Sequence, residues 1–170
     1  LYYYDFNVLK PPFDNVKVRQ AFAAPIDKQG IVDFITKGGE VPAPTLTPPG
    51  SVGHVPASAG IGIPFDPEHA KALLAEAGYP DGKGLPTITL AFNAGETHSR
   101  IAQAVQQMWQ NTLGATVDLQ PVEGRAYSQI AAEGAFNVWR MGWGMDYPDA
   151  NNIHAELFTS NVGAAAIVRN

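Results

Sequence analysis

The chain has 170 residues, enough for one domain with a hydrophobic core, and its net charge of −5 comes without a basic stripe, so nucleic acid is not an expected partner. Cysteine is absent, which excludes disulfides, thiolate metal sites and a cysteine nucleophile. No signal peptide or membrane-spanning apolar run is visible, so a soluble domain is predicted, and a start at Leu1 without Met favours a piece of a larger protein.

The first forty residues predict one strand and two short helices. Residues 2–8 are rich in aromatic side chains, as strands are. Asn15 is placed to cap a helix over residues 16–24, and Asp27 is placed to cap a second helix that ends at two glycines. The side chains of this second helix expected to face inward are Ile31, Phe34 and Ile35.

Residues 41–64 differ from the rest of the chain in composition. They contain six prolines and four glycines with almost no charge. This composition predicts a long loop without regular structure, lying as a belt over the domain surface. Loops of this length in compact domains are usually functional, so a contact surface for a protein partner is the alternative interpretation.

From residue 66 onward the pattern is that of an α/β fold. Asp66 and Pro67 are typical of a helix start. Strands are predicted over 85–92, 116–122 and 136–141, with helices over 97–113, capped by Thr97, and 125–133 between them. This order predicts a mostly parallel sheet with right-handed crossovers. Ligands then bind beyond the carboxyl ends of the strands, where the loops are 93–96, 123–125 and 142–148.

Catalytic and metal-binding motifs are not evident in this sequence. The four histidines lack metal-ligand spacing, and no phosphate-binding or nucleophile-elbow motif occurs, so neither a metal nor a cofactor is expected. Asp146 and Asp149 suggest a carboxylate pair for acid–base chemistry, which keeps a small hydrolase as an alternative function. Asp149 is, however, well placed to cap a helix over residues 152–158.

The segment RMGWGMDYPDANN, residues 140–152, is the best candidate for ligand recognition. Trp143 offers a flat wall, and Asp146 suits a cation, most naturally an ammonium group. Arg140, at the end of a predicted strand, suits a carboxylate through a bidentate contact. A peptide carries both of these charges, so a small zwitterion is the ligand that this segment favours.

Four segments of the chain resemble a known family. They are KPPFDNVKVRQAFAAPID at 10–27, FDPEHAKALLAEAGYPDG at 65–82, IAQAVQQMWQNTLGATVDL at 101–119 and WGMDYPDANN at 143–152. Their sequence and order resemble the second lobe of the extracytoplasmic solute-binding proteins of the peptide/nickel/opine family, which serve ABC importers. The resemblance fades in the last ten residues.

The resemblance implies a type II periplasmic-binding-protein-like fold, with residues 1–170 forming one α/β lobe of two. It implies a non-enzymatic protein outside the cytoplasm that hands its ligand to a membrane permease. A di- or oligopeptide is the ligand that suits Asp146 best, and opines, nickel complexes and sugars are the alternatives within the family. In peptide-binding members of the family the aspartate of W-x-x-D-Y pairs with the peptide ammonium, which assigns that role to Asp146. Trp143, Arg140, Gly144 and Tyr147 complete the expected ligand-binding set. The first lobe would be the missing partner, and the peptide would bind extended, like an added strand.

Overall fold

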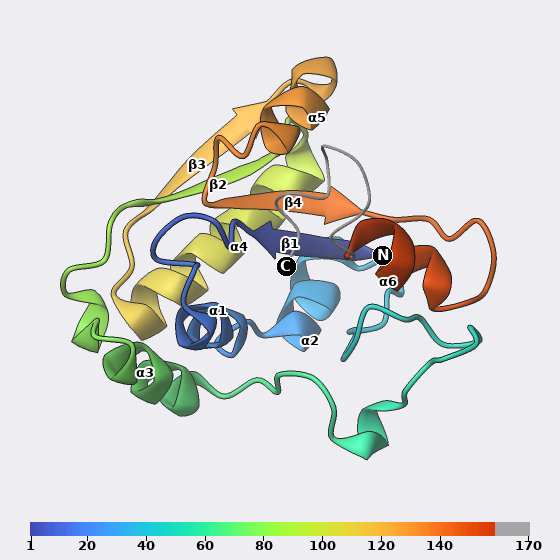
Figure 1. Ribbon diagram of the computed structural model, residues 1–170, viewed down its shortest axis with the longest axis horizontal. Helices are drawn as coiled ribbons and strands as arrows, with labels where there is room; N and C mark the ends of the chain where they lie inside the picture. Colours follow the sequence, from blue (N-terminus) through green and yellow to red (C-terminus); the bar gives the residue numbers. More distant parts are fainter. Residues whose placement is uncertain (159–170) are drawn as a thin grey trace.

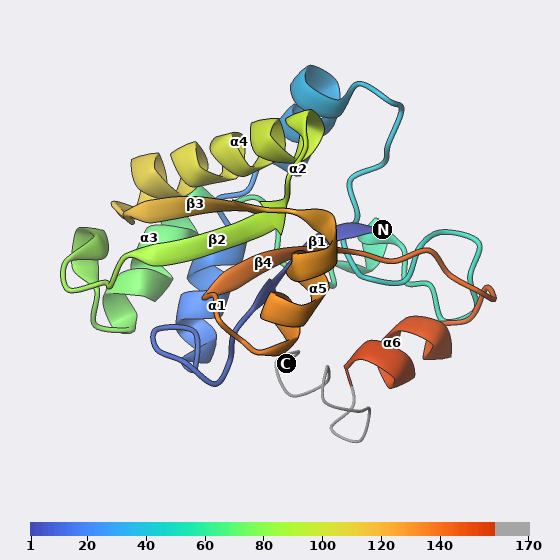
Figure 2. The same cartoon turned by 90° about the horizontal axis from the view of Figure 1, so that it is seen from above.

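The computed structural model describes residues 1–158, except for the side chains of residues 125, 128, 131 and 132. Within these residues one sheet carries helices on both faces (Figures 1 and 2). The strands are β1 (Tyr2–Phe6), β2 (Ile88–Asn93), β3 (Val117–Val122) and β4 (Val138–Gly142). The helices are α1 (Val16–Ala23), α2 (Lys28–Ile31), α3 (Pro67–Glu76), α4 (Glu96–Leu113), α5 (Gly124–Ala132) and α6 (Asn151–Leu157). Shorter turns are the π-helix η1 (Val32–Thr36) and the 3-10 helices η2 (Ala57–Ala59) and η3 (Pro80–Gly82).

The sheet has the strand order β1-β4-β2-β3. Strand β2 is parallel to both β3 and β4, and β1 is antiparallel to β4. The predicted mostly parallel α/β sheet is therefore confirmed. The carboxyl ends of β2, β3 and β4 meet at one edge of the sheet, and the start of β1 lies there as well because Tyr2 pairs with Gly142.

Alternation along β2 separates two hydrophobic clusters. Leu90 points into the larger cluster, formed with α1, α3 and α4, whereas Ala91 lies on the opposite face under Tyr127 of α5. The burial of both faces of β2 explains its nearly continuous apolar sequence, as expected for a central strand. Tyr127 is accordingly buried.

A chain of aromatic rings forms the centre of the larger cluster. Phe6 stacks on Phe13, which meets Phe22 edge-on, and Phe22 meets Trp109 edge-on, with centroid distances of 4.8, 5.0 and 5.0 Å. The Trp109 indole also donates a hydrogen bond to the Phe22 carbonyl at 2.6 Å. The rings therefore join β1, α1 and α4 into one body.

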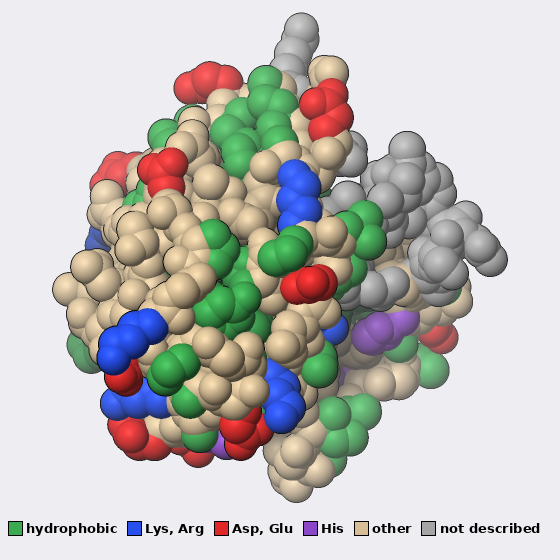
Figure 3. Space-filling view, turned by 60° about the vertical axis from the view of Figure 1, so that its left-hand side comes forward, with side chains coloured by type: hydrophobic (Ala, Val, Ile, Leu, Met, Phe, Trp, Pro, Cys, Tyr) green, Lys and Arg blue, Asp and Glu red, His purple; other side chains and the backbone are tan. Residues whose placement is uncertain are grey.

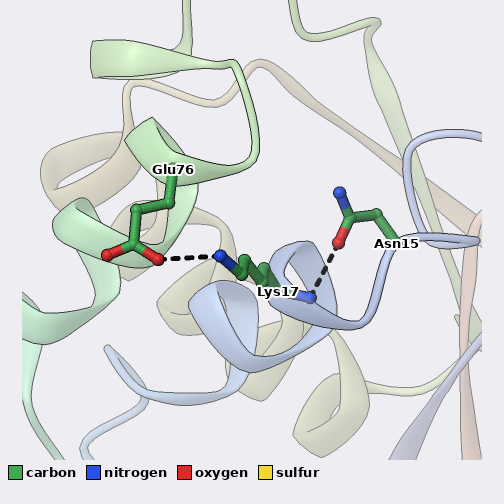
Figure 4. A network of polar contacts seen from close by, with 3 residues as sticks. All are labelled: Asn15, Lys17 and Glu76. Carbon is green, nitrogen blue, oxygen red and sulfur yellow. Dashed lines mark hydrogen bonds and ion pairs between the residues drawn. The ribbon is translucent and has the colours of Figure 1, made fainter.

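Two predicted helix starts are confirmed by their capping hydrogen bonds. The Asn15 side chain accepts from Lys17 N at 2.9 Å, and the Asp66 side chain accepts from His69 N at 2.9 Å. The Lys17 ammonium also reaches Glu76 of α3 at 2.9 Å (Figure 4), and this contact lowers the pKa of the Glu76 carboxyl. Since both side chains are about half exposed, the ion pair contributes little to stability.

The second helix differs from its predicted form. It begins at Asp27 as expected, but it changes into a π-helix at Val32, where Lys37 N bonds to Val32 O. Hydrogen bonds in a π-helix join residues five apart instead of four apart, so the residues that share one face of the helix change. The expectation that Phe34 faces inward is wrong: its side chain is 73% exposed, while Ile31 and Ile35 pack against the core.

The predicted cap of the long helix α4 is also wrong. Gly95 stands at the N-cap position, and Thr97 lies inside the first turn without a capping bond. The strand before this helix begins at Ile88 rather than 85, because Pro86 has no N–H to donate and the ladder starts with Ile88 N bonding to Thr116 O.

Residues 41–64 lack regular structure apart from η2 and one isolated bridge, as predicted. The expectation of a belt over the surface is incomplete, because residues 47–54 are bonded to the segment that follows β4. On the face shown in Figure 3, acidic and basic side chains are interspersed rather than gathered into a patch of one sign.

Candidate ligand-binding site

The first part of the candidate site is a cluster around Arg140, at the edge where the parallel strands end. The Arg140 guanidinium donates to the Asn93 side chain at 3.0 Å and lies 4.7 Å above the ring of Tyr2. The ring of His98, in the first turn of α4, lies 5.7 Å from that of Tyr2. The structure thus brings together residues from β1, β2, β4 and the start of α4, as the position of the loops predicts.

Arg140 carries the fixed positive charge of this cluster. Burial raises the pKa of Tyr2, and burial together with the Arg140 charge lowers the pKa of His98, so both side chains are neutral at pH 7. The ion pairs among the described residues are Lys17–Glu76 and Lys71–Glu68, which leaves Arg140 without a carboxylate partner there. Its Nε is buried and makes no hydrogen bond to any described residue. A half-buried guanidinium in this state suits an anionic group from a ligand.

The second part is the loop after β4, which is organised by Asn152. This side chain is fully buried in α6. Its carbonyl oxygen accepts from the Trp143 indole at 2.9 Å and from Asp146 N at 3.2 Å, and its amide donates to Glu156 at 3.1 Å. Asn152 therefore sets the positions of the indole and the aspartate together. The sequence interpretation missed this residue, although the adjacent pair Asn151-Asn152 is an unusual polar start for a helix.

The Asp146 carboxylate faces solvent. Among the described residues its nearest hydrogen-bond donor is the Asn152 amide, at 3.5 Å. This is the outer limit of a hydrogen bond, so the carboxylate retains most of its accepting capacity. Gly144, two residues earlier, is exposed with open space beside its Cα, which leaves the backbone of this stretch accessible.

Tyr147 and Asp149 have contacts within the protein. The Tyr147 hydroxyl donates to Glu156 at 3.0 Å and accepts from Asn151 at 2.9 Å, which turns it toward α6. The Asp149 carboxylate accepts from Asn151 N at 2.8 Å and so stabilises the start of α6, although the N-cap position is Ala150 and the helix covers Asn151–Leu157 instead of the predicted 152–158. Since Asp149 has this structural task, the arrangement gives no support to an acid–base pair with Asp146.

Residues 47–54 of the long loop are hydrogen-bonded to the segment that follows β4. Val52 N donates to Pro148 O and Val52 O accepts from Ala150 N, both at 2.9 Å. The hydroxyl of buried Thr47 lies 3.0 Å from the His154 ring. Gly53 has φ +82° at the point of closest approach, where an added Cβ would lie 2.8 Å from that of Ala150. The Pro/Gly-rich loop is therefore a clamp on the candidate site.

Comparison with known proteins matches residues 1–164 to the bacterial extracellular solute-binding proteins, family 5, middle part. The chain belongs to this family. It is 35% identical over 167 residues to the oligopeptide-binding protein OppA of Bacillus subtilis, covering 96% of this chain and 30% of that protein. It is also 35% identical over 168 residues to the periplasmic oligopeptide-binding protein OppA of Escherichia coli, covering 96% of this chain and 31% of that one.

Solved structures confirm the fold. The murein tripeptide binding protein MppA of Escherichia coli superposes with a TM-score of 0.85 at 33% identity, over 99% of this chain and 34% of that one. OppA of Listeria monocytogenes bound to peptide superposes with a TM-score of 0.86 at 26% identity, over 98% and 35%. The type II periplasmic-binding-protein-like fold is therefore confirmed, and the chain spans about a third of the length of these relatives.

In residues 1–158, no helix combines the length and apolar character needed to cross a membrane. The same residues contain no group of three or more histidine, aspartate or glutamate side chains arranged to hold a metal ion. The family is one of solute-binding proteins and not of enzymes.

Proposed function

We propose that residues 1–170 form one lobe of a two-lobe solute-binding protein that captures short peptides outside the cytoplasm for an ABC importer. The observation that carries this proposal is the pair of opposite charges at one sheet edge. Arg140 lacks a carboxylate partner among the described residues, and Asp146, six residues on, presents an exposed carboxylate. The names of the relatives, oligopeptide-binding and murein tripeptide binding proteins, agree with a peptide as the ligand.

A peptide suits this arrangement in three respects. Its ammonium group would meet Asp146, and its carboxylate would meet Arg140. The exposed backbone at Gly144 is available for hydrogen bonds of the kind made by an added strand. Trp143, half-buried and fixed by Asn152, would form one wall.

The remaining two-thirds of the protein has a role in this proposal. A single lobe offers one wall and leaves the ligand facing water, so the first lobe would supply the opposite wall and complete desolvation. Binding would be followed by delivery to the permease, without chemical change of the peptide.

The test uses the full-length protein and calorimetry with trialanine and N-acetyl-trialanine. Asp146→Asn is expected to weaken binding of trialanine by about 10- to 100-fold, because a charge-assisted contact of about 1.5–3 kcal/mol is lost. The acetylated peptide, which lacks the ammonium group, should lose little. Asp118→Asn, which removes an exposed carboxylate on β3, serves as the control and should leave both affinities unchanged. Equal losses for the two peptides with Asp146→Asn would refute the ammonium role.

A further inference from the structure

A cavity of about 640 Å³ lies beside β1 and is separate from the loop that carries Asp146. Its walls come from the start of β1, from α2 and η1, from α4 between Thr97 and Trp109 and from residues 41–46 of the long loop. The apolar side chains that line it include Phe22, Ile31, Val32, Leu46, Ile101 and Val105. Its volume is within the range of small-molecule sites, and its walls are mainly apolar, as in such sites.

The charged groups at this cavity already have partners. The Lys28 ammonium donates to the Ala43 carbonyl at 3.0 Å, which fixes the loop wall in place. The Glu40 carboxylate accepts from the Thr36 hydroxyl at 2.8 Å and from Gly38 N at 3.0 Å. The occupant that these walls suit is therefore neutral.

Three buried polar atoms at the cavity lack partners. The Tyr4 hydroxyl, the Thr45 hydroxyl and the His98 Nδ1 make no hydrogen bond to any described residue, and all three residues line the cavity. Buried polar atoms in proteins nearly always have a partner, so the occupant is expected to bring a hydrogen-bonding group into a mainly apolar space. An aliphatic side chain satisfies the apolar walls but offers no hydrogen bond to these three atoms.

The cavity adjoins the cluster around Arg140. Tyr2 and His98 line the cavity, and the ring of Tyr2 also lies under the Arg140 guanidinium. A peptide with its carboxylate at Arg140 would therefore have its last side chain beside the cavity mouth.

We propose that this cavity receives the last side chain of the bound peptide and favours an aromatic side chain with a neutral polar tip, of which tyrosine is the natural example. This inference rests on the proposed peptide-binding function and adds the side-chain class to it. The aromatic ring fills the apolar space, and its hydroxyl supplies a hydrogen-bond partner for Thr45, one of the three unpartnered groups.

The test compares the peptides Ala-Ala-Tyr, Ala-Ala-Phe, Tyr-Ala-Ala and trialanine on the full-length protein by calorimetry. Ala-Ala-Tyr should bind at least about tenfold more tightly than trialanine and more tightly than Tyr-Ala-Ala, because a large side chain is buried only at the last position. Thr45→Val should lower the affinity for Ala-Ala-Tyr to near that for Ala-Ala-Phe. The affinity for Ala-Ala-Phe itself should not change. No gain from tyrosine at the last position, while trialanine binds, would overturn this inference and leave the proposed function standing.

A second variant fills the cavity. Val32→Trp should reduce the affinity for Ala-Ala-Tyr to that for trialanine, and Phe34→Trp, on the exposed side of the same π-helix, should retain the preference. A preference that survives Val32→Trp overturns the inference. It is also overturned if Val32→Trp lowers the melting temperature without changing any preference, since the cavity then holds another part of the polypeptide. If none of the peptides binds, the proposed function falls and this inference with it.

Discussion

The hydrophobic body of the described structure and its candidate site are built in different ways. The body is held by apolar burial: β2, α1 and α4 meet around Trp109, which is 1% exposed. The loop after β4 is held by hydrogen bonds that converge on one buried amide, Asn152, and by backbone bonds from Val52. Apolar packing fixes the body, whereas a polar network fixes a loop and still leaves a carboxylate open to solvent. The Asp146 carboxylate therefore takes no part in the apolar packing that stabilises the body.

Trp109→Ala is the substitution expected to destabilise the hydrophobic body most. The change leaves a cavity at the end of the aromatic chain and removes the bond to the Phe22 carbonyl, so the lobe should lose about 3–5 kcal/mol. Denaturant unfolding of the full-length protein, followed by circular dichroism, measures this loss. Phe34→Ala, which removes an exposed ring of similar kind, should change stability by less than about 0.5 kcal/mol. Similar losses for both variants would contradict the assigned core.

Asn152→Leu tests the polar network. It leaves the Trp143 indole and Asp146 N without their shared acceptor, at a cost of about 1–3 kcal/mol. Because the loop loses its fixed geometry, affinity for trialanine should fall by more than the loss expected from stability alone, at least about tenfold. Calorimetry at a temperature where the variant is folded separates the two effects. Asn151→Ala, at the neighbouring exposed position, is the control, and an equal effect of both changes would contradict the central role of Asn152.

Gly53→Ala tests the contact between the long loop and the segment after β4, and it has the smallest expected effect. The substitution meets the Cβ of Ala150 and also strains a backbone with φ +82°, so it should cost about 1–2 kcal/mol. Gly60→Ala is the matched control, because Gly60 has φ +68° but open space beside it. Gly53→Ala should lose more stability than Gly60→Ala. Adding Ala150→Gly to Gly53→Ala should restore that extra stability, as measured by thermal unfolding. No recovery would show that the clamp does not depend on this contact.

The sequence predicted the body better than the site. Ile88, Leu90 and Phe92 alternate, and Asp66 stands directly before Pro67, so local pattern alone located β2 and the start of α3. Phe34 was misassigned because a π-helix shifts the face on which a residue lies, and no local pattern marks that shift. Thr97 was misassigned because Gly95 already provides the extended backbone of the N-cap.

The site depends on contacts between residues far apart in the chain. Arg140 and Asp146 were identified from their segment, but their partners Tyr2, Asn93 and Asn152 come from three other elements. The clamp by residues 47–54 joins parts of the chain about a hundred residues apart, for which composition gives only a loop. The last residues, 159–170, where the resemblance fades, lie outside the described part of the chain.

The indole of Trp143 gives the protein an optical reporter of its own. The chain has three tryptophans, of which Trp109 and Trp139 are nearly inaccessible, at 1% and 2% exposure, while Trp143 is half-buried beside Asp146. A water-soluble quencher therefore reaches mainly one emitter in this lobe. A molecule bound to the loop after β4 would shield the Trp143 indole from the quencher, so binding can be followed by tryptophan fluorescence without a label.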